Sequence, residues 1–415
     1  MPLKKPKVFY GYWIVAATFL STLIHSGCGF FVFSLFVKPI QSDLGWSRGE
    51  IMAAFTAYYI VIGLSSPLVG RLVDRYGARK VIFTGALTAG SGFVLLSMVN
   101  SLWQFYLSYA IVGAGMAAIG YVPGSAVVSN WFKKRRGTAI GIMSMGIGAG
   151  GLALAPLVGG YLIPNFGWSA SYLALAVITC VIVIPLASFV IRTKPAELGL
   201  YPDGMEAPEA VSVTKDLPTV SGGLTLKMAL ATPAFWLISV CFLSSNFSQV
   251  GVIQNQVPYL EDAGFPVAMA ATALGVLGLG SALSKFFFGW LCDHIQAKYA
   301  CSIGLVLQVV SIAILMNIGP ASPATIIWLY AIMMGISSGS WLPTMSMLTS
   351  TNFGLASYGA IFGAVAVSQA IGTATGPLTA GFMYDAINSY HLAFILFIAL
   401  YAISIPTVLA VRRPK

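Results

Sequence analysis

A lysine, Lys285, lies inside an apolar stretch of the chain, within the segment SALSKFFFGWLCDH at 281–294. An ammonium group at the centre of a membrane helix costs about 3 kcal/mol or more, so a residue of this kind usually serves a function. None of the twelve acidic residues lies in the middle of an apolar stretch, so the sequence offers Lys285 no obvious partner. Because an unpaired buried charge is unfavourable, we expect Lys285 to bind a carboxylate that the substrate supplies.

Small residues occur around Lys285 at spacings of three and four, which places them along one side of a helix: Gly275, Gly278, Ala282 and Gly289. In membrane helices, small residues are typical of surfaces that face another helix or a cavity. The alternative is that Lys285 lies near the end of its helix and extends its side chain to the lipid headgroups. The line of small residues favours an interior position.

Polar and aromatic side chains recur at helical spacing on other apolar stretches and could complete a binding site. Thr18, Ser21, His25 and Cys28 follow one side of the first stretch, and an aromatic residue stands two positions before a proline in two others. Hydrogen bonding between helices is the alternative role for each polar residue. The predicted substrate-binding residues are Lys285, Ser281, Tyr121, His25, Asn246, Gln249 and Trp341.

Three residues are candidates to carry a proton. His25 is the side chain on these polar lines that titrates near neutrality, although it could instead be a hydrogen-bonded interior histidine. Lys285 could cycle between its charged and neutral forms, and Asp262 lies with Glu261 at the end of an apolar stretch. The sequence does not choose among these three.

Composition sets the class of protein. Of the 415 residues, 58% are hydrophobic and 8% are charged, with a mean hydropathy of +0.86, whereas a soluble domain carries about 25% charged residues. The net charge of +10 does not indicate nucleic-acid binding, because the basic residues lie in short loops between apolar stretches. The five cysteines occur singly, and no nucleophile–base pair or metal-ligand spacing is seen, so we expect no enzyme, metal site or cofactor.

Apolar stretches long enough to cross about 30 Å of hydrocarbon occur twelve times. We therefore predict an all-α integral membrane protein with an N-terminal six-helix bundle (1–192), a linker (193–229) without a helical pattern, and a C-terminal six-helix bundle (230–415). The predicted spans are 12–36, 51–73, 81–100, 104–129, 137–163, 168–192, 233–258, 267–291, 300–319, 324–350, 359–383 and 391–411.

The basic residues predict the orientation in the membrane. Of the 22 lysines and arginines, all but Lys38, Arg48 and Lys285 lie in loops that the twelve spans place on one side, together with both termini. Cytoplasmic loops carry an excess of Lys and Arg. We therefore expect a multi-pass protein of the cell membrane with both termini in the cytoplasm. We also expect it to function as a monomer in the bilayer.

The two halves resemble each other in sequence. Four blocks match in the same order at offsets between 219 and 223, and they share Trp, Asp, Pro and Gly at equivalent places; these blocks are 12–22 with 235–245, 70–80 with 289–299, 113–123 with 333–343, and 155–160 with 376–381. General apolarity does not explain the matched Asp and Pro residues. The sequence therefore predicts two pseudo-symmetric bundles.

A charged motif, GRLVDRYGARK at 70–80, joins the second and third spans. Its acid, Asp74, lies among basic residues and has a counterpart, Asp293, in the second half. Ion pairs of this kind could form and break between two halves that rock, and the alternative is an ordinary solvated basic loop. The predicted latch residues are Asp74, Arg75, Arg79, Arg136 and Asp293.

This motif and the duplicated six-helix unit resemble the major facilitator superfamily, whose halves are related in this way. YGYWIVAATFL in the first span and IRTKPAELGLYPDG at 191–204 resemble the monocarboxylate transporter and oxalate:formate antiporter families. Monocarboxylate transporters have an arginine where this chain has Lys285, four residues before Gly289, and an aspartate where it has Ser281. Lysine offers a compact charge where arginine offers a planar fork. The resemblance also implies that spans one, four, seven and ten line a central cavity.

The resemblance and the lone Lys285 together predict a secondary active transporter. We expect it to move a small monocarboxylate, lactate-like or pyruvate-like in size, by alternating access and together with a proton. One alternative is an organic-anion exchanger of the oxalate:formate type, which the absence of Lys or Arg from 359–383 disfavours. Another alternative is a sensor that keeps a transporter fold without transporting. An exporter of cationic drugs would need an acid inside a span, and none is present.

Overall fold

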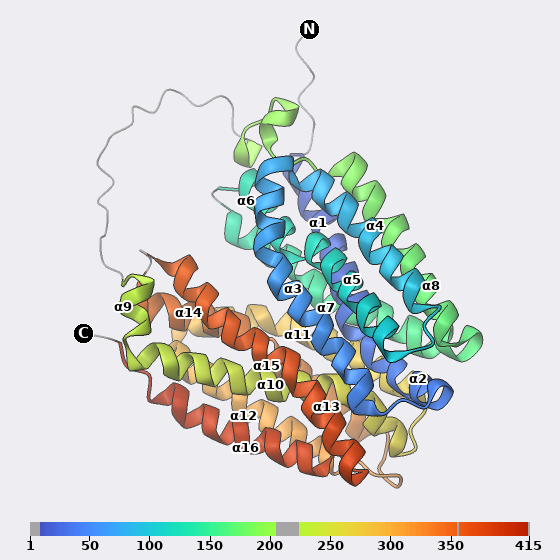
Figure 1. Ribbon diagram of the computed structural model, residues 1–415. Helices are drawn as coiled ribbons and strands as arrows, with labels where there is room; N and C mark the ends of the chain where they lie inside the picture. Colours follow the sequence, from blue (N-terminus) through green and yellow to red (C-terminus); the bar gives the residue numbers. More distant parts are fainter. Residues whose placement is uncertain (1–8, 134, 205–223, 355–356, 414–415) are drawn as a thin grey trace.

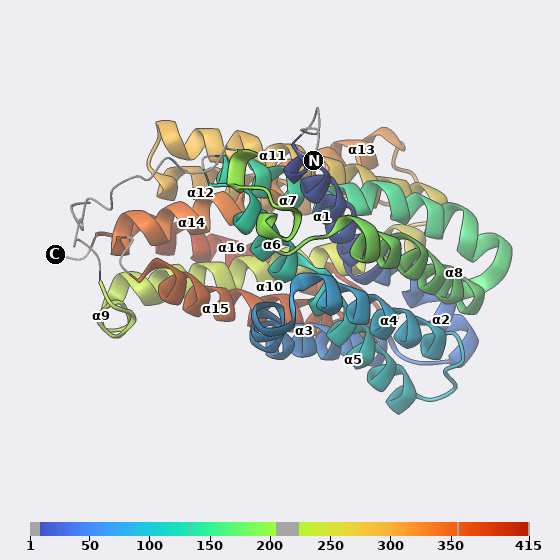
Figure 2. The same cartoon turned by 90° about the horizontal axis from the view of Figure 1, so that it is seen from above.

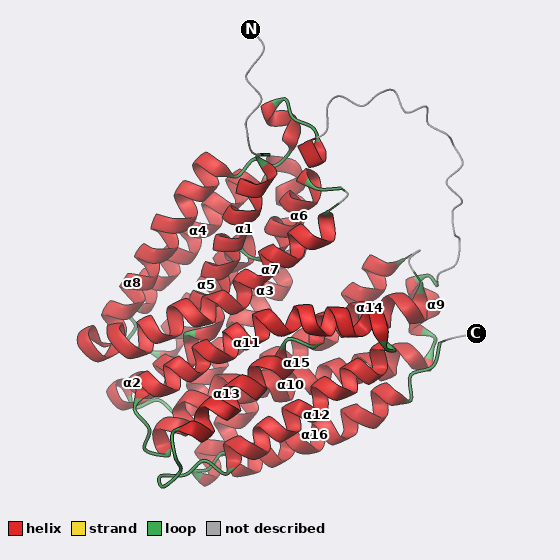
Figure 3. Ribbon diagram, turned by 180° about the vertical axis from the view of Figure 1, so that it is seen from behind, coloured by secondary structure: helices red, strands yellow, loops and turns green. Residues whose placement is uncertain are grey.

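The computed structural model describes residues 9–133, 135–204, 224–354 and 357–413, and over these residues the chain is helical without strands (Figure 3). In the described residues, eleven helical segments are long and apolar enough to cross a membrane. One of them, Gly137–Val190, has 54 residues, about 80 Å of helix at 1.5 Å per residue. It is broken at Gly167, where φ is 76°. Because it counts as two spans, the twelve predicted spans are all accounted for.

The first half comprises α1 to α8, and the second half comprises α9 to α16. The helices of the first half are α1 (Gly11–Ser26), α2 (Val37–Leu44), α3 (Arg48–Tyr76), α4 (Ala78–Leu96), α5 (Leu102–Ile119), α6 (Tyr121–Trp131), α7 (Arg136–Leu157) and α8 (Ile163–Pro185). Those of the second half are α9 (Leu226–Leu230), α10 (Pro233–Asp262), α11 (Val267–His294), α12 (Ala297–Met316), α13 (Thr325–Ser338), α14 (Trp341–Phe353), α15 (Tyr358–Ile387) and α16 (His391–Leu409).

The predicted linker, 193–229, contains more helix than its sequence indicates. Two short 3₁₀ turns occupy Pro195–Leu198 and Pro202–Gly204, and α9 closes the segment. Its middle part, 205–223, lies outside the described residues. The linker begins against the first half, because the hydroxyl oxygen of Thr193 accepts a hydrogen bond of 3.0 Å from the Ala78 amide at the start of α4.

The most extensive helix contacts between the halves are those of α3 with α15 and of α7 with α11. In Figure 2, α3, α4 and α5 gather on one side of the molecule, and α12, α14 and α16 gather on another. The α7–α11 contact depends on glycine, since a Cβ atom added to Gly148 would clash with the carbonyl oxygen of Gly278. Gly275, Gly278 and Ala282 of the small-residue line therefore face α7, as the sequence predicts, whereas Gly289 borders open space.

The fourth and tenth spans are each broken in the middle. Pro123 and Pro343 have no amide hydrogen, and the proline ring crowds the carbonyl group four residues earlier. The helix therefore stops at Ile119 in one half and at Ser338 in the other, and it resumes at Tyr121 and Trp341. Sequence analysis predicted each span as continuous and missed both breaks.

The two bundles diverge toward one end of the molecule and meet at the other (Figure 1). We call the first end the termini face, because α1 begins there and α16 ends there. The second is the far face, where α2 ends and α3 begins. Both faces contribute to the candidate site described next.

Candidate substrate-binding site

A cavity of about 200 Å³ lies between the two halves. It is lined by α1, α3, α6, α7, α10, α11, α13, α14 and α15 and by the π-helical segment Gly27–Phe31 that follows α1. Every residue that the sequence predicts for substrate binding lines this one cavity: Lys285, Ser281, Tyr121, His25, Asn246, Gln249 and Trp341. The fold thus brings together residues that are up to 316 positions apart in the chain, while the roles assigned to them remain predictions.

Lys285 lies at the junction of two cavities. It lines the central cavity and a neighbouring one of about 440 Å³, which continues between Tyr121, Pro343 and Tyr358. Within the described part of the chain, no acidic side chain forms an ion pair with Lys285. This position in the interior favours the expectation that Lys285 meets a substrate, over the alternative that it reaches the lipid headgroups.

His25 connects the first-half wall of the cavity to the broken fourth span. Its Nδ1 atom lies 2.9 Å from the carbonyl oxygen of Met116, and since a carbonyl only accepts, Nδ1 carries the hydrogen. The hydroxyl of Ser21 donates a bond of 2.7 Å to the carbonyl of Ile119, one residue before the break. The other ring nitrogen of His25, Nε2, has no hydrogen-bond partner among the described residues.

Amide side chains form the second-half wall. The Gln249 amide donates a hydrogen bond of 3.3 Å to the carbonyl of Ser338, at the break in the tenth span. Asn246 accepts a bond of 3.4 Å from Gln369 on α15. Each half therefore uses a polar residue of its first span to bind a carbonyl exposed by a broken helix. These contacts fit the alternative role of hydrogen bonding between helices and still leave the side chains at the cavity surface.

Sequence analysis missed some of the cavity wall. Gln369 and Thr373 on α15, and Tyr59 on α3, line the cavity without a charge or a motif to mark them. The four-residue spacing of Gln369 and Thr373 puts them on one face of a helix that is otherwise rich in small and apolar residues, and this signal could have found them.

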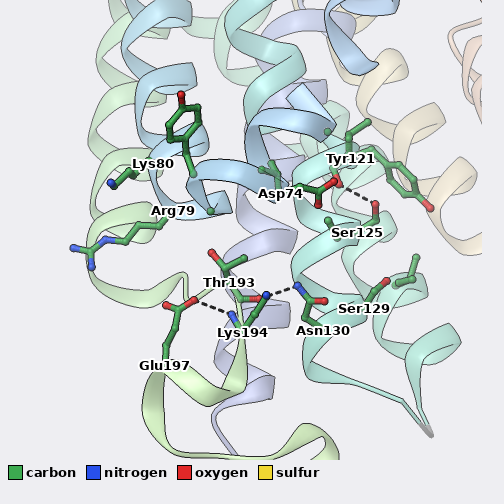
Figure 4. Close-up of a pocket in the computed structure, with 17 residues that line it drawn as sticks. Asp74, Arg79, Lys80, Tyr121, Ser125, Ser129, Asn130, Thr193, Lys194 and Glu197 are labelled. Atoms are coloured by element: carbon green, nitrogen blue, oxygen red, sulfur yellow. Dashed lines mark hydrogen bonds between the residues drawn. The ribbon is translucent and has the colours of Figure 1, made fainter. Parts of the chain in front are cut away.

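A wider cavity of about 1100 Å³ lies near the termini face (Figure 4). It lies within the first half, and Tyr121 lines it as well as the two cavities at Lys285. Its charged lining residues come from the 70–80 motif and from the start of the linker: Asp74, Arg79, Lys80, Lys194 and Glu197. Tyr121 therefore lies in the wall of all three cavities.

The described residues of the predicted latch form no ion pair with one another in this conformation. Asp74, Arg75, Arg79 and Asp293 are all exposed, and no ion pair joins any two of them among the described residues. The Arg75 guanidinium instead lies 5.2 Å from the ring centre of its neighbour Tyr76. The side chain of Arg136 lies outside the described residues. Because the two halves are apart at the termini face, the latch remains a prediction about a different conformation.

Ion pairs join the halves at the far face instead. Arg48, at the start of α3, is only 2% exposed, and its guanidinium donates two hydrogen bonds to Asp262 at the end of α10, of 2.6 and 3.0 Å. The ammonium of Lys38 lies 2.7 Å from the same carboxylate. Asp262, a predicted proton carrier, therefore lies away from the central cavity and forms ion pairs with the first half.

A second acid of the C-terminal half binds the start of α3. The carboxylate of Asp385 accepts hydrogen bonds from the backbone amides of Arg48, at 3.0 Å, and Gly49, at 2.7 Å. Amides at a helix start have no partner within the helix, so an acid there stabilises it. We call Lys38, Arg48, Asp262 and Asp385 the far-face lock. Sequence analysis placed Lys38 and Arg48 apart from the other basic residues but missed their partners.

Two bundles of membrane-spanning helices with a cavity between them are typical of solute transporters and not of enzymes. The family model of the Major Facilitator Superfamily matches the chain over residues 18–374 and 258–415, and the chain belongs to that superfamily. This agrees with the resemblance found in the sequence.

Curated relatives include carboxylate transporters. The chain is 28% identical to the oxalate:formate antiporter of Oxalobacter formigenes, over 93% of this chain and 90% of that one. It is 26% identical to human monocarboxylate transporter 11, over 80% and 68%. It is 25% identical to mouse monocarboxylate transporter 12, over 93% and 82%.

Solved structures show the same fold at low identity. The nucleoside transporter NupG superposes with a TM-score of 0.77 at 11% identity, over 97% of this chain and 99% of that one. A bacterial homologue of the human lysosomal transporter Spinster superposes with a TM-score of 0.73 at 17% identity, over 98% and 95%.

Proposed function

We propose that this protein transports a small monocarboxylate, lactate-like or pyruvate-like in size, by alternating access. The observation that carries the proposal is the position of Lys285, a cation in the wall of a cavity of about 200 Å³ with no protein carboxylate paired to it among the described residues. One carboxylate of the cargo would neutralise this charge. The names of the relatives, which include monocarboxylate transporters and an oxalate:formate antiporter, support cargo of this class.

Alternating access fits the state of the two faces. The widest cavity lies near the termini face, and the far-face lock holds the other end together. When the halves rock, the lock would break, and the residues of the predicted latch would come together at the termini face. On the distribution of basic residues we propose that the termini face is cytoplasmic. Labelling a cysteine introduced at Ser42, on the far face, in intact cells tests this orientation.

Anion exchange is the second candidate, because the oxalate:formate antiporter is 28% identical over nearly the whole chain. A dianion such as oxalate would favour two cations at the site. Of the described residues that line the central cavity, only Lys285 is cationic, and α15 contributes none. Preloading liposomes with formate or oxalate, and measuring whether uptake then accelerates, separates exchange from net transport.

Uptake into proteoliposomes tests the proposal. A panel of labelled short carboxylic acids should include at least one that the wild-type protein accumulates, and Lys285→Ala should reduce its uptake at least a hundredfold. Lys285→Arg should retain part of it, because the charge remains but its shape changes. Lys227→Ala is the matched control, since Lys227 is exposed on α9 and lines none of the cavities.

Unchanged uptake in Lys285→Ala, with both variants inserted equally, would contradict the assigned site. A wild-type protein that takes up no acid of the panel would favour the alternative of a sensor that does not transport.

We further propose that His25 carries the proton that accompanies the anion. Its Nδ1 hydrogen is engaged by Met116, so Nε2 is the nitrogen left to accept a proton at the cavity. His25→Gln keeps a donor for the Met116 carbonyl and removes the titrating ring. Carboxylate uptake by His25→Gln should no longer depend on pH between 5.5 and 7.5. A pH profile of uptake like that of the wild type would exclude His25 as the proton carrier.

A further inference from the structure

Glu261 lies beside the far-face lock without being part of it. It precedes Asp262 at the end of α10, and its side chain is only 17% exposed. One carboxylate oxygen, Oε2, is 4.0 Å from the ammonium of Lys38, the outer limit of an ion pair. The other, Oε1, is buried and receives no hydrogen bond among the described residues. A carboxylate in this position lacks the donors that normally stabilise its charge.

Asp262, the neighbouring acid, pairs with the two cations that could otherwise stabilise a charged Glu261. Asp262 lies 2.7 Å from Lys38 and 2.6 Å from Arg48. The lock with Glu261 contains two cations and three acids, because Asp385 adds a further carboxylate at the start of α3. The formal charge of the closed cluster is therefore negative by one unit, and one proton on Glu261 would make it neutral.

The other groups around the cluster do not supply a positive charge that would balance it. Two tyrosines, Tyr384 on α15 and Tyr390 before α16, pack on the Arg48 guanidinium, and their hydroxyls are neutral near pH 7. The carboxylate of Glu50 is bonded to the Ser47 amide in the cap of α3. A histidine, His391, is exposed nearby at the start of α16. It therefore has to be distinguished experimentally from Glu261.

We propose that Glu261 takes up a proton when the far face closes, so that the far-face lock is a proton-sensitive gate. In the closed state the carboxyl group is largely withdrawn from water and one of its oxygens receives no hydrogen bond among the described residues, so its neutral form is favoured. When the halves separate, Lys38 and Arg48 leave with the first half, and Glu261 meets water, which stabilises its charged form. Because the closed state binds this proton more tightly, acid favours closure and alkali favours opening of the far face.

This gate goes beyond the proposed function, since it concerns no cargo and works with an empty cavity. It also provides a proton-binding group, Glu261, outside the central cavity. A proton arriving from the far side would close the far face behind an entering anion. The proton at His25 and the proton at Glu261 are separate proposals with separate readouts.

Distance measurements on labelled protein test the gate. Spin labels on Ser42→Cys in α2 and Ala386→Cys in α15 report the gap at the far face, because both positions are exposed and lie on different halves. The five native cysteines are first replaced. The full chain is placed in lipid nanodiscs without any carboxylic acid, and double electron–electron resonance gives the ratio of closed to open molecules from pH 4.5 to 8.

The wild-type ratio of closed to open should rise as the pH falls, by at most about tenfold per pH unit for a single proton. Glu261→Gln, which imitates the protonated acid, should stay closed across the range, and Glu261→Ala should also lose the pH dependence. Asp43→Asn is the matched control: Asp43 is an exposed far-face acid that binds Trp168, and it should behave as the wild type. His391→Gln should do the same.

A wild-type ratio that does not change with pH would overturn the proposal, as would pH dependence that survives in Glu261→Gln and Glu261→Ala. Pronounced loss of the effect in His391→Gln would assign the proton to that residue instead. Since the measurement needs no transport, a failure of carboxylate uptake leaves its outcome intact, and Lys285→Ala should keep the pH-dependent closure.

Discussion

Both faces of the molecule carry acidic and basic side chains, but the two faces use them differently. At the far face, acids of the second half bind cations and amides of the first half at 2.6 to 3.0 Å. At the termini face, the charged motif at 70–80 lies open, and within the described residues none of its side chains forms an ion pair with the second half. The contrast indicates that charge content does not decide which face is closed. In this conformation the faces differ in the contact between the halves, which is present at the far face.

The contacts between the halves explain how the faces can exchange roles. Glycines bring α7 and α11 close together through Gly148 and Gly278, and the α3–α15 contact provides the second pivot. Both contacts lie beside the central cavity, so rocking about them would move the two faces in opposite senses. The lock and the latch then act as alternating closures of one path, and the following substitutions test that comparison.

Removing the acid of the lock should have the largest effect. Asp262→Ala leaves the guanidinium of Arg48, 2% exposed, without its carboxylate. Breaking a buried ion pair costs about 3–5 kcal/mol, and we expect about 3 kcal/mol against the closed far face because the Asp262 side chain is 29% exposed. The Ser42–Ala386 label distance should lengthen. A closed distance equal to that of Asp43→Asn would show that the lock does not hold this face.

A smaller effect is expected from Asp385. Asp385→Ala removes the acceptor for the amides of Arg48 and Gly49. The loss of a cap at a helix start costs about 1–2 kcal/mol. The closed fraction in the same label experiment should fall about tenfold, and Asp385→Asn should fall less because it keeps an acceptor. Equal effects of Asn and Ala would mean that charge, and not hydrogen bonding, holds α3.

At the termini face, Thr193 caps the start of α4, and its loss should affect the first half alone. Thr193→Val removes the acceptor for the Ala78 amide at the start of α4 and costs about 1 kcal/mol. Hydrogen exchange in the first turn of α4 should accelerate about fivefold, with Thr193→Ser close to the wild type. The far-face distance should stay the same, and a change there would contradict the independence of this cap from the lock.

The smallest effect on this conformation is expected at the latch. Asp74→Asn should change stability by less than about 0.5 kcal/mol, because Asp74 is exposed and forms no ion pair with a described residue here. Transport should nevertheless slow, since the state with a closed termini face would lose its acid. Uptake at the wild-type rate would leave the 70–80 motif with a role in topology alone.

Much of the candidate site was visible in the sequence because a helix repeats every 3.6 residues. His25, Asn246, Gln249 and Lys285 each stand on a polar or small-residue line, and such lines face the interior of a membrane bundle. Tyr59 was missed because a lone polar residue on an apolar helix indicates a face but not what that face meets, whereas the spacing of Gln369 and Thr373 was a signal that went unused. The helix breaks beside Tyr121 and Trp341 were missed because proline in a span can kink a helix or stop it.

The sequence alone determined the composition of the spans, their number, the duplication of the halves and the excess of basic residues on one side. These follow from local properties, since hydrophobic length and charge act residue by residue. Which face is closed, and which acid pairs with Arg48, was decided only by the tertiary structure. Asp262 and Asp385 are 214 and 337 positions from Arg48, and no spacing rule connects residues that meet only when two bundles pack together.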